Sequence, residues 1–526
     1  MGRAIGLTRA CGLLALLVLV ASDTVVFYEG ALPTTLNPLF SRSMVDRRAQ
    51  ELIFDRLFHR STFTGEVRSR LVDVAAILDD GAGVRLVVRN GIRWHDGERL
   101  TADDLCFTVD ALLDRETPSQ MARPYREVLL GCIVEDRKTA VIRFTRPVHN
   151  PEEQLGFPII PRHKFDSARI QPDDAFAVRP VGTGPMRGRK GRSEVFFDAN
   201  HNAHHEPGVA ALRLAEGGDP LVQVRTLLNG GVQGLIAVSP ALRSDVMTSD
   251  DVALKSYDLR SWWYIAIDTD HPILRHVEVR NALDAALDRL QLRELTLGYD
   301  PEDPVQPCEF ISGPFVPSSP YYDRGVPVRL RSDLAAVREQ MSAVGAEQRH
   351  GSWVVDGEPL TLRVGMHAPL DLEARDLLNL VGNQLQAAGF DRRVFKVSDD
   401  DWSTAAVSGD LKGKYDLLIG KWSFGVVENV GPLFETRTAT RGAYNLFDYS
   451  DPEVDRLVRS WEDARTIGQA QEAYQSLHAR LAADRPYLFL WKLDTKSAWR
   501  NEVTGATVTP YWYFTDFDGW GFNPDD

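Results

Sequence analysis

The chain has 526 residues, which is too long for a single hydrophobic core of ordinary size. Two to four lobes with clefts between them are therefore expected. Its composition, 44% hydrophobic and 25% charged, is typical of a folded globular protein and excludes a disordered or membrane-embedded one. The formal net charge of -14 argues against nucleic acid as a partner, because an acidic surface repels phosphate backbones.

Residues 1–22 have the pattern of a secretory signal peptide. Arg3 and Arg9 supply a positive start, residues 13–21 form an apolar run too short to span a bilayer, and small residues follow at 20–22. We expect cleavage near Ser22 and a mature protein that is soluble in the periplasm or another extracytoplasmic space. An uncleaved membrane anchor is the alternative.

Beyond this segment the chain has three cysteines, Cys106, Cys132 and Cys308, too few for a disulfide scaffold. In an oxidising compartment Cys106 and Cys132 could pair. Two independently buried thiols explain them equally well.

Residues 84–112 combine strand, turn and helix signals in consecutive positions. Residues 84–89 alternate charged and apolar side chains as a strand does, and Asn90-Gly91 and Asp96-Gly97 are turn dipeptides. Thr101, with Asp104 three residues later, is typical of a capped helix start. The pattern predicts a hairpin followed by a helix.

Alternating strands and helices are predicted along the rest of the chain, with no fixed-period repeat. Strands are expected at 24–28, 139–144, 261–268, 360–364 and 417–419. Helices are expected at 48–58, 277–295, 334–344, 377–388, 453–465 and 469–484. Gly182, Thr183, Gly184 and Pro185 form a compact stretch that we interpret as a crossover or hinge. The predicted fold class is therefore α/β, with mixed β-sheets flanked by helices.

Residues 84–110, whose core from Gly91 reads Gly-Ile-Arg-Trp-His-Asp-Gly-Glu-Arg-Leu-Thr-Ala-Asp-Asp-Leu-Cys-Phe-Thr-Val-Asp, resemble the hallmark of the family-5 extracellular solute-binding proteins. These are the peptide- and nickel-type binding proteins of ABC importers. Weaker matches follow in the family's order and extend the resemblance over nearly the whole mature chain; they lie at 159–163, 180–185, 279–289, 311–314, 334–345 and 445–455.

The resemblance implies a two-lobed clamp of the periplasmic-binding-protein type, with an extra small subdomain. Lobe I would comprise residues 23–46, 182–262 and 498–526, the subdomain residues 47–181, and lobe III residues 263–497. Lobe III would close over a ligand cleft, with no cofactor. The segment from 91 to 110 itself is expected to be architectural rather than ligand-contacting.

Relatives that hold a peptide ammonium carry an Asp in a Trp-x-x-Asp segment, whereas residues 421–425 here read Lys-Trp-Ser-Phe-Gly. Either Glu428 replaces that carboxylate or the ligand lacks a free amine there, because an unpaired ammonium in a closed cleft is costly. The candidate ligand-binding residues, each with core or surface packing as its alternative, are Ser43, Met44, Val45, Trp422, Ser423, Phe424, Gly425, Glu428 and Trp491.

His201, His204 and His205 could offer imidazoles to zinc or nickel, but a solvent-exposed turn is the favoured interpretation and no metal site is predicted. The sequence contains no Gly-x-Ser-x-Gly elbow, His-Glu-x-x-His motif or phosphate-binding loop. Covalent catalysis therefore has no positive support, and we predict a protein that is not an enzyme. A secreted hydrolase with dispersed catalytic residues is the weakest alternative.

The leading hypothesis is a monomeric receptor that captures a peptide-like or other small polar ligand and delivers it to the permease subunits of an ABC transporter. The second is a ligand-sensing or chaperone-like protein on the same scaffold, not coupled to uptake. The altered segment at 421–425 is what makes the second hypothesis credible.

Overall fold

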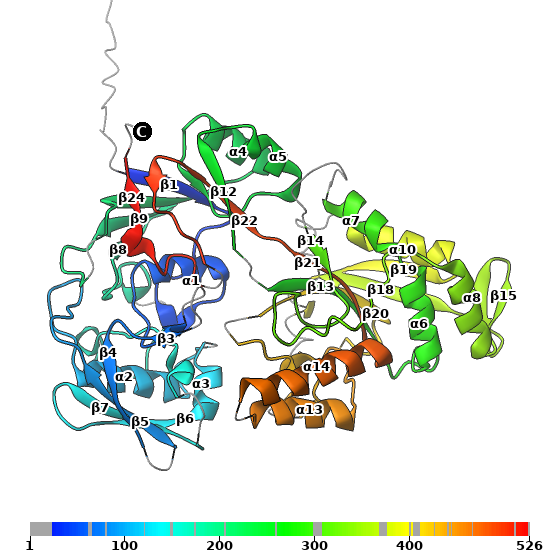
Figure 1. The fold of residues 1–526 in the computed structure, drawn as a ribbon, viewed down its shortest axis with the longest axis horizontal. Helices are drawn as coiled ribbons and strands as arrows, with labels where there is room; N and C mark the ends of the chain where they lie inside the picture. Colours follow the sequence, from blue (N-terminus) through cyan, green and yellow to red (C-terminus); the bar gives the residue numbers. More distant parts are fainter. Residues whose placement is uncertain are drawn as a thin grey trace, which may run out of the picture.

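The protein is described by a computed structural model. It covers residues 24–523 apart from 61–65, 79–80, 120, 148–150, 173–174, 205–206, 258–259, 298–307, 368–375, 399–400, 403–410, 425–426, 439–440, 443, 465 and 510–511. The predicted signal peptide at 1–22 and two site candidates, Gly425 and His205, lie outside the described residues. Three sheets of four or more strands organise the described chain (Figure 1).

The first sheet has seven strands in the order β12-β22-β11-β1-β10-β9-β8 and is mixed, because β1 runs parallel to both of its neighbours while the other pairs are antiparallel. β1 alternates along its length and buries Val25 and Phe27. The strands are β1 (Thr24–Glu29), β8 (Met186–Lys190), β9 (Glu194–Ala199), β10 (Ala211–Glu216), β11 (Gly234–Leu235), β12 (Val252–Ser256) and β22 (Lys496–Arg500).

The second sheet is antiparallel, in the order β4-β5-β7-β6, and lies below the first in Figure 1. Its elements are β4 (Val72–Ile77), β5 (Gly83–Val88), α2 (Ala102–Leu113), α3 (Arg123–Val128), β6 (Leu129–Val134) and β7 (Thr139–Phe144). The predicted start of α2 is confirmed, since the Thr101 N–H donates to the Asp104 carboxylate at 2.8 Å. A disulfide joins Cys106 of α2 to Cys132 of β6, which settles the two alternatives for these cysteines in favour of pairing.

The third sheet has six strands in the order β14-β21-β13-β20-β18-β19. Every residue of β13, Ser-Trp-Trp-Tyr-Ile-Ala-Ile, is buried, because helices cover both faces of this sheet. Helices α6, α8 and α10 pack on one face, and α13 and α14 on the other. The strands are β13 (Ser261–Ile267), β14 (Cys308–Phe310), β18 (Thr361–His367), β19 (Asp391–Val397), β20 (Leu417–Ser423) and β21 (Tyr487–Leu493).

The remaining helices and small strands cover or connect these sheets. The helices are α1 (Met44–Glu51), α4 (Pro220–Leu228), α5 (Arg243–Met247), α6 (Val277–Ala286), α7 (Arg289–Leu297), α8 (Leu334–Ala343), α10 (Leu377–Ala387), α12 (Gly431–Phe434), α13 (Pro452–Glu462) and α14 (Ile467–Asp484). The small strands are β2 (His59–Arg60), β3 (Val67–Arg68), β15 (Glu347–Arg349), β16 (Ser352–Val355), β17 (Glu358–Pro359), β23 (Val503–Thr504) and β24 (Gly521–Phe522).

Two predicted helices differ from the structure. The helix expected at 48–58 ends at Glu51, because the following backbone bonds to distant segments instead: the Gly184 N–H donates to the Ile53 carbonyl and the Leu57 N–H to the Phe157 carbonyl. The helix expected at 277–295 is divided at Leu287, which leaves the helical region and separates α6 from α7. In both cases the apolar spacing correctly indicated which residues are buried, but it did not show that the helix ends early or is divided in two.

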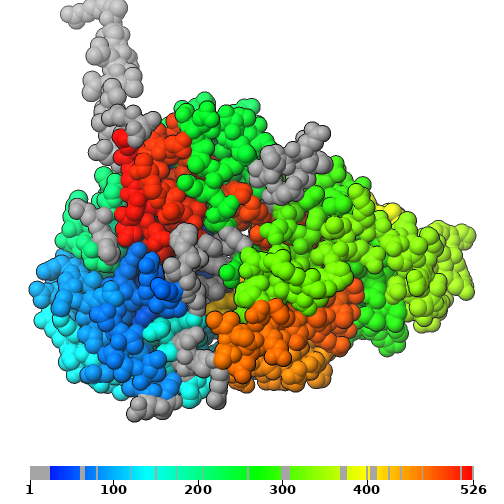
Figure 2. Space-filling view, in the orientation of Figure 1, coloured from blue at the N-terminus to red at the C-terminus, as the bar shows by residue number. Residues whose placement is uncertain are grey.

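The chain passes between the seven-stranded and six-stranded sheets only twice within the described residues and their short gaps. Residues 257–260 connect β12 to β13, and residues 494–495 connect β21 to β22. In the space-filling view, the blue and cyan residues face the orange residues across a furrow (Figure 2). The exposed pair Arg146–Asp463, with Nη1 3.9 Å from Oδ1, joins these two parts of the molecule.

Replacing both paired cysteines, C106A/C132A, should lower the free energy of unfolding by about 3 kcal/mol, because the disulfide closes a loop of intermediate length in the unfolded chain. Chemical denaturation monitored by circular dichroism measures this. A reducing agent should weaken the wild type by a similar amount and leave C106A/C132A unchanged. Equal stability of the oxidised wild type and the double variant would contradict the pairing.

Candidate functional site

The candidates Trp422 and Ser423 lie at the end of β20, and Phe424 follows directly after it, next to the place where the chain enters the six-stranded sheet. The register aligns Trp422 with Trp262 of β13, and the Ser423 hydroxyl lies 2.7 Å from that of Ser261. The structure thus confirms a strand at this position and extends it beyond the predicted residue 419.

Trp422 is half-buried and forms an aromatic edge with two neighbours. Its ring centroid lies 5.5 Å from that of Tyr444 and 6.5 Å from that of Phe424. The indole Nε1 is buried and has no hydrogen-bond partner in the described part of the chain. Tyr444 is 46% exposed, whereas Phe424 is buried against Phe315. Because this donor is buried, the exposed part of the edge is aromatic ring surface, which can stack on an apolar group.

Glu428, the possible substitute for the absent acidic residue, already has partners in the protein. Its carboxylate is almost fully buried, lies 3.0 Å from Nη1 of Arg260 and accepts a hydrogen bond from the Ser319 hydroxyl. Arg260 belongs to the first crossing and adopts a left-handed φ of 46°, which is costly for a residue with a Cβ. A protein cation therefore already pairs with the carboxylate that was one of the two alternatives for meeting a ligand ammonium.

Ser43, Met44 and Val45 form the start of α1 and are half-buried. The Ser43 hydroxyl accepts the Asp46 N–H at 3.1 Å, and the Asp46 carboxylate accepts the Ser43 N–H at 3.0 Å, so this pair caps the helix. The Ser43 side chain is therefore used for capping. The sequence left ligand contact and surface-loop packing open for these residues and did not indicate this cap.

The C-terminal end of α1 leads to a charged cluster that the sequence did not indicate. Arg56 lies with its guanidinium carbon 3.5 Å from the ring centroid of Trp512 and donates from Nη1 to the Gly156 carbonyl at 2.6 Å. The carboxylate of Glu51 accepts the Phe514 N–H at 3.0 Å through Oε2, while its buried Oε1 has no hydrogen-bond partner in the described chain.

Burial dominates the protonation of this cluster. It raises the pKa of Glu51 to about 8, although the Phe514 N–H and the positive charges of Arg56, Arg48 and Arg47 act in the opposite direction. Burial also lowers the pKa of Arg56 to about 10, against the attraction of Glu51. A half-buried acid that stays protonated near neutral pH can donate or accept a hydrogen bond from a ligand.

Gly182, Thr183, Gly184 and Pro185 do not lie on either connection between the two large sheets. A Cβ on Gly182 would stand 1.8 Å from the Ile53 carbonyl oxygen, so the backbone approaches too closely for any other residue. His95 Nδ1 accepts the Gly182 N–H at 3.1 Å, and Nε2 therefore donates to the Gly184 carbonyl. The residues expected to form the hinge are thus tightly packed against Ile53 and His95, directly before β8.

The histidine cluster at 201–205 shows no assembled metal site in its described part. His204 lies with Nε2 3.7 Å from Oδ2 of Asp55, whose carboxylate also accepts the Thr183 hydroxyl at 2.8 Å, while His201 is exposed. Among the described residues, no group of three or more His, Cys, Asp or Glu side chains is arranged to hold a metal ion.

Trp491 is fully buried in the apolar layer that also contains Trp263, on the face of the six-stranded sheet opposite Trp262. Direct ligand contact would require this layer to open, so the structure favours its packing alternative. Trp422 differs because it reaches the partly exposed end of β20.

One serine–histidine pair resembles a nucleophile and its base but has the wrong tautomer for that chemistry. The Ser312 hydroxyl lies 2.9 Å from Nε2 of His478, and His478 Nδ1 accepts the Asp323 N–H at 3.2 Å. Because Nδ1 is an acceptor, Nε2 carries the proton and donates to Ser312. Burial lowers the pKa of His478 to about 4, in keeping with a neutral structural imidazole.

Comparison with known proteins identifies what this architecture is similar to. The family model described as bacterial extracellular solute-binding proteins, family 5 Middle, matches residues 66–443. Protein XP55 of Streptomyces lividans is 26% identical over 492 residues, covering 90% of this chain and 84% of the relative. The oligopeptide-binding protein AppA of Bacillus subtilis is 21% identical over 503 residues, covering 91% of this chain and 88% of its own length.

Solved structures show the same fold. AppA of Bacillus subtilis in complex with a nonapeptide superposes with a TM-score of 0.76 at 18% identity, covering 95% of this chain and 98% of that one. NikA from Brucella suis in complex with Fe(III)-EDTA superposes with a TM-score of 0.79 at 17% identity, covering 95% of this chain and all of that one (100%). In both comparisons the sequence identity is below one quarter, so the similarity concerns the fold alone. That fold is a two-lobed clamp.

Replacing Arg260 by alanine should lower the free energy of unfolding by about 2 kcal/mol, because it leaves the buried Glu428 carboxylate without its cation. The double variant R260A/E428Q should recover most of this loss, since the uncompensated charge is removed. Urea denaturation of the wild type, both single variants and the double variant forms the cycle. Equal instability of R260A and R260A/E428Q would show that the ion pair is not the cause.

Glu51 should make the protein less stable as pH rises. Its pKa of about 8 in the folded protein exceeds its ordinary value of 4.5, so the folded state holds a proton that the unfolded state releases between these values. Stability from this group is complete below about pH 4.5 and lost as pH approaches 8. E51Q should therefore gain on the order of 2 kcal/mol relative to wild type between about pH 5 and about pH 9.

Guanidinium unfolding at both pH values measures the effect of E51Q, with the exposed E98Q as a matched control for loss of one carboxylate. The difference between E51Q and wild type should change with pH, whereas that between E98Q and wild type should not. A pH-independent E51Q difference would contradict the elevated pKa.

Proposed function

The chain belongs to the bacterial extracellular solute-binding proteins of family 5, and we propose that it captures a small polar or peptide-like ligand between two lobes and delivers it to an ABC transporter permease. One observation carries this proposal: in the described part of the chain, two large sheets, each with its own apolar core, are joined by two short connections. Such an architecture allows closure over a ligand with little change inside either lobe.

The proposed lobes follow the sheets. Lobe I would comprise residues 23–46, 182–262 and 498–526, with the subdomain at 47–181 and lobe III at 263–497. The seven-stranded, four-stranded and six-stranded sheets support this division, because the connections at 257–260 and 494–495 lie within a few residues of its boundaries. We place the hinge between lobe I and lobe III at these two connections rather than at Gly182–Pro185.

The proposed ligand contacts lie on both walls of the furrow. Trp422 and Ser423 would present the wall of lobe III, and Gly425, which lies outside the described residues, is a further candidate there. The segment from Ser43 to Glu51, at the boundary between lobe I and the subdomain, would present the opposite wall. Because Arg260 already neutralises Glu428, we propose a ligand without a free ammonium at that position. AppA is bound to a nonapeptide and NikA to Fe(III)-EDTA. Proteins with this fold therefore accept both peptide and non-peptide ligands.

We also propose that residues 1–22 act as a signal peptide that directs export, and that the mature protein is a monomer. In the part of the chain that the structure describes, no helix has the length and apolar character needed to cross a membrane. The proposed activity is binding and release, with no covalent step.

Native mass spectrometry of the gently purified mature protein tests the proposal. We expect a mass excess that disappears on denaturation and yields a released molecule without a free primary amine at its recognised end. A non-peptide ligand or a blocked peptide would support the proposal. An empty protein that a broad ligand library fails to stabilise would contradict it.

W422A should weaken binding of the released molecule at least about tenfold, because loss of an aromatic contact costs about 1.5 kcal/mol or more. Isothermal titration calorimetry measures the affinity. W402A is the matched control, since Trp402 stacks on His367 in the same lobe at a ring distance of 4.7 Å and is not proposed to meet the ligand. Equal affinities of W422A and wild type would remove Trp422 from the site.

A further inference from the structure

The guanidinium of Arg56 lies close to the end of α1 and is held by two uncharged groups of the protein. The side chain is half-buried; its Nη1 donates to the Gly156 carbonyl at 2.6 Å, and its central carbon lies 3.5 Å from the ring centroid of Trp512. These contacts keep the planar group in one orientation. Neither contact supplies a negative charge, so the charge of Arg56 is fixed in place but not neutralised by them.

The other edge of this guanidinium, formed by Nε and Nη2, is unused. In the described part of the chain neither nitrogen has a hydrogen-bond partner, and neither is enclosed by the protein. The two parallel N–H groups of such an edge match two oxygens of a carboxylate or a phosphate. Arg56 therefore presents a preformed fork for one oxyanionic group.

Among the described residues, no ionised carboxylate neutralises Arg56 at pH 7. The acidic side chain whose charge acts on it is Glu51, and burial raises the pKa of Glu51 to about 8, so this group is mostly protonated. The adjacent Asp55 is engaged elsewhere, because its carboxylate accepts the Thr183 hydroxyl at 2.8 Å. Burial lowers the pKa of Arg56 to about 10, to which the positive charge of the exposed Arg47 contributes, and Arg56 is still charged at pH 7.

One short stretch near the C-terminus positions both Arg56 and Glu51. Trp512 stacks on Arg56, and two residues later the Phe514 N–H donates to Oε2 of Glu51 at 3.0 Å. Tyr125 of α3 is also nearby: burial raises the pKa of its hydroxyl, and the charge of Arg56 acts in the opposite direction. Aromatic rings and a neutral acid thus surround the guanidinium, and charge-assisted hydrogen bonds are stronger where water is partly excluded.

This group lies near the furrow between the two parts of the molecule. α3, which carries Tyr125, is followed by the chain that pairs with the end of β7, since the Thr145 N–H donates to the Val128 carbonyl at 2.8 Å. The next residue, Arg146, reaches across the furrow to Asp463, which follows α13. Arg56 therefore continues the proposed wall from Glu51 into the subdomain.

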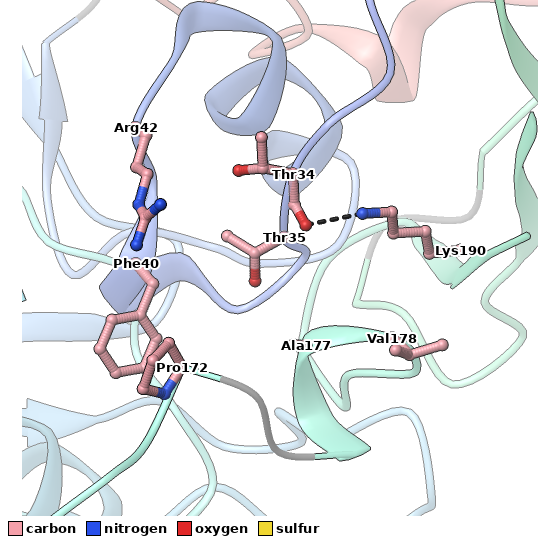
Figure 3. A pocket seen from close by; sticks show the side chains of 8 residues that line it. All are labelled: Thr34, Thr35, Phe40, Arg42, Pro172, Ala177, Val178 and Lys190. Atoms are coloured by element: carbon pink, nitrogen blue, oxygen red, sulfur yellow. Dashed lines mark hydrogen bonds between the residues drawn. The ribbon is translucent and has the colours of Figure 1, made fainter. Parts of the chain in front are cut away.

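A separate pocket of about 260 Å³ lies beside the loop that precedes α1 (Figure 3). Arg56 does not line this pocket, and the Nζ of its Lys190 already donates to the Thr34 carbonyl at 2.6 Å. The fork of Arg56 is thus distinct from it.

We propose that Arg56 determines the ligand class of the cleft, and that its Nε–Nη2 edge binds an oxyanionic group, a carboxylate or a phosphate, of the captured molecule. This inference rests on the proposed function, because it needs a ligand held between the two walls. A half-buried cation without a counter-charge is costly, and a bound oxyanion removes that cost. The neutral contacts at Glu51 and the stacking on Trp422 would hold the rest of the ligand.

Native mass spectrometry of the mature protein with three pools of N-acetylated tripeptides, matched in sequence, tests this assignment. The first pool ends in a free carboxylate, the second in an amide, and the third in an amide with one serine phosphorylated. We expect at least one anionic pool to bind about tenfold or more tightly than the amide pool, because it gains charge-assisted hydrogen bonds. The preferred anionic pool identifies the oxyanion. R56Q should reduce this preference to within about twofold.

R123Q is the matched control, since Arg123 is an exposed cation at the start of α3, and it should keep the preference of the wild type. Thermal unfolding shows whether each variant folds, and the ratio of anionic to amide affinity does not depend on a general loss of binding. Equal affinities for the anionic and amide pools, no binding of either anionic pool, or equal effects of R56Q and R123Q would overturn the inference. A molecule released from the purified wild type in those cases would leave the proposed function standing.

Discussion

The geometry of this protein depends on two short connections between its large sheets. β12 and β22 pair antiparallel in one sheet, β13 and β21 pair antiparallel in the other, and residues 257–260 and 494–495 link the two pairs. At the first connection Arg260 holds an unfavourable left-handed conformation, and its side chain reaches the buried Glu428. Within the described residues, these two connections, the Arg260–Glu428 ion pair and the exposed Arg146–Asp463 pair link the two parts of the molecule.

Two carboxyl groups of the protein avoid an unpaired negative charge in different ways. Glu428 lies 3.0 Å from the guanidinium of Arg260, whereas Glu51 is half-buried with one oxygen that has no hydrogen-bond partner in the described chain and a pKa raised to about 8 by burial. A site that has neutralised both carboxylates offers little to an ammonium group. We therefore propose a ligand that is recognised through stacking on Trp422 and through neutral hydrogen bonds.

Local sequence signals predicted the local structure well. The turn glycines Gly91 and Gly97 have φ values of 86° and 91°, and Thr101 begins α2 as expected. Long-range contacts could not be predicted in this way. Arg260 and Glu428 are far apart in sequence, and the end of α1 is decided by bonds from residues 183–186 to Leu52 and Ile53. The family resemblance supplied the architecture, but the partners of each candidate side chain required the structure.

Hydrogen–deuterium exchange of the protein with and without the molecule released from it tests the central claim, capture between two lobes, most directly. The account predicts slower exchange on both walls at once, in the segment around α1 and in the segment around the end of β20, with further slowing at 257–260. Protection confined to one lobe would contradict capture between them, because a ligand that contacts a single wall cannot hold the clamp closed.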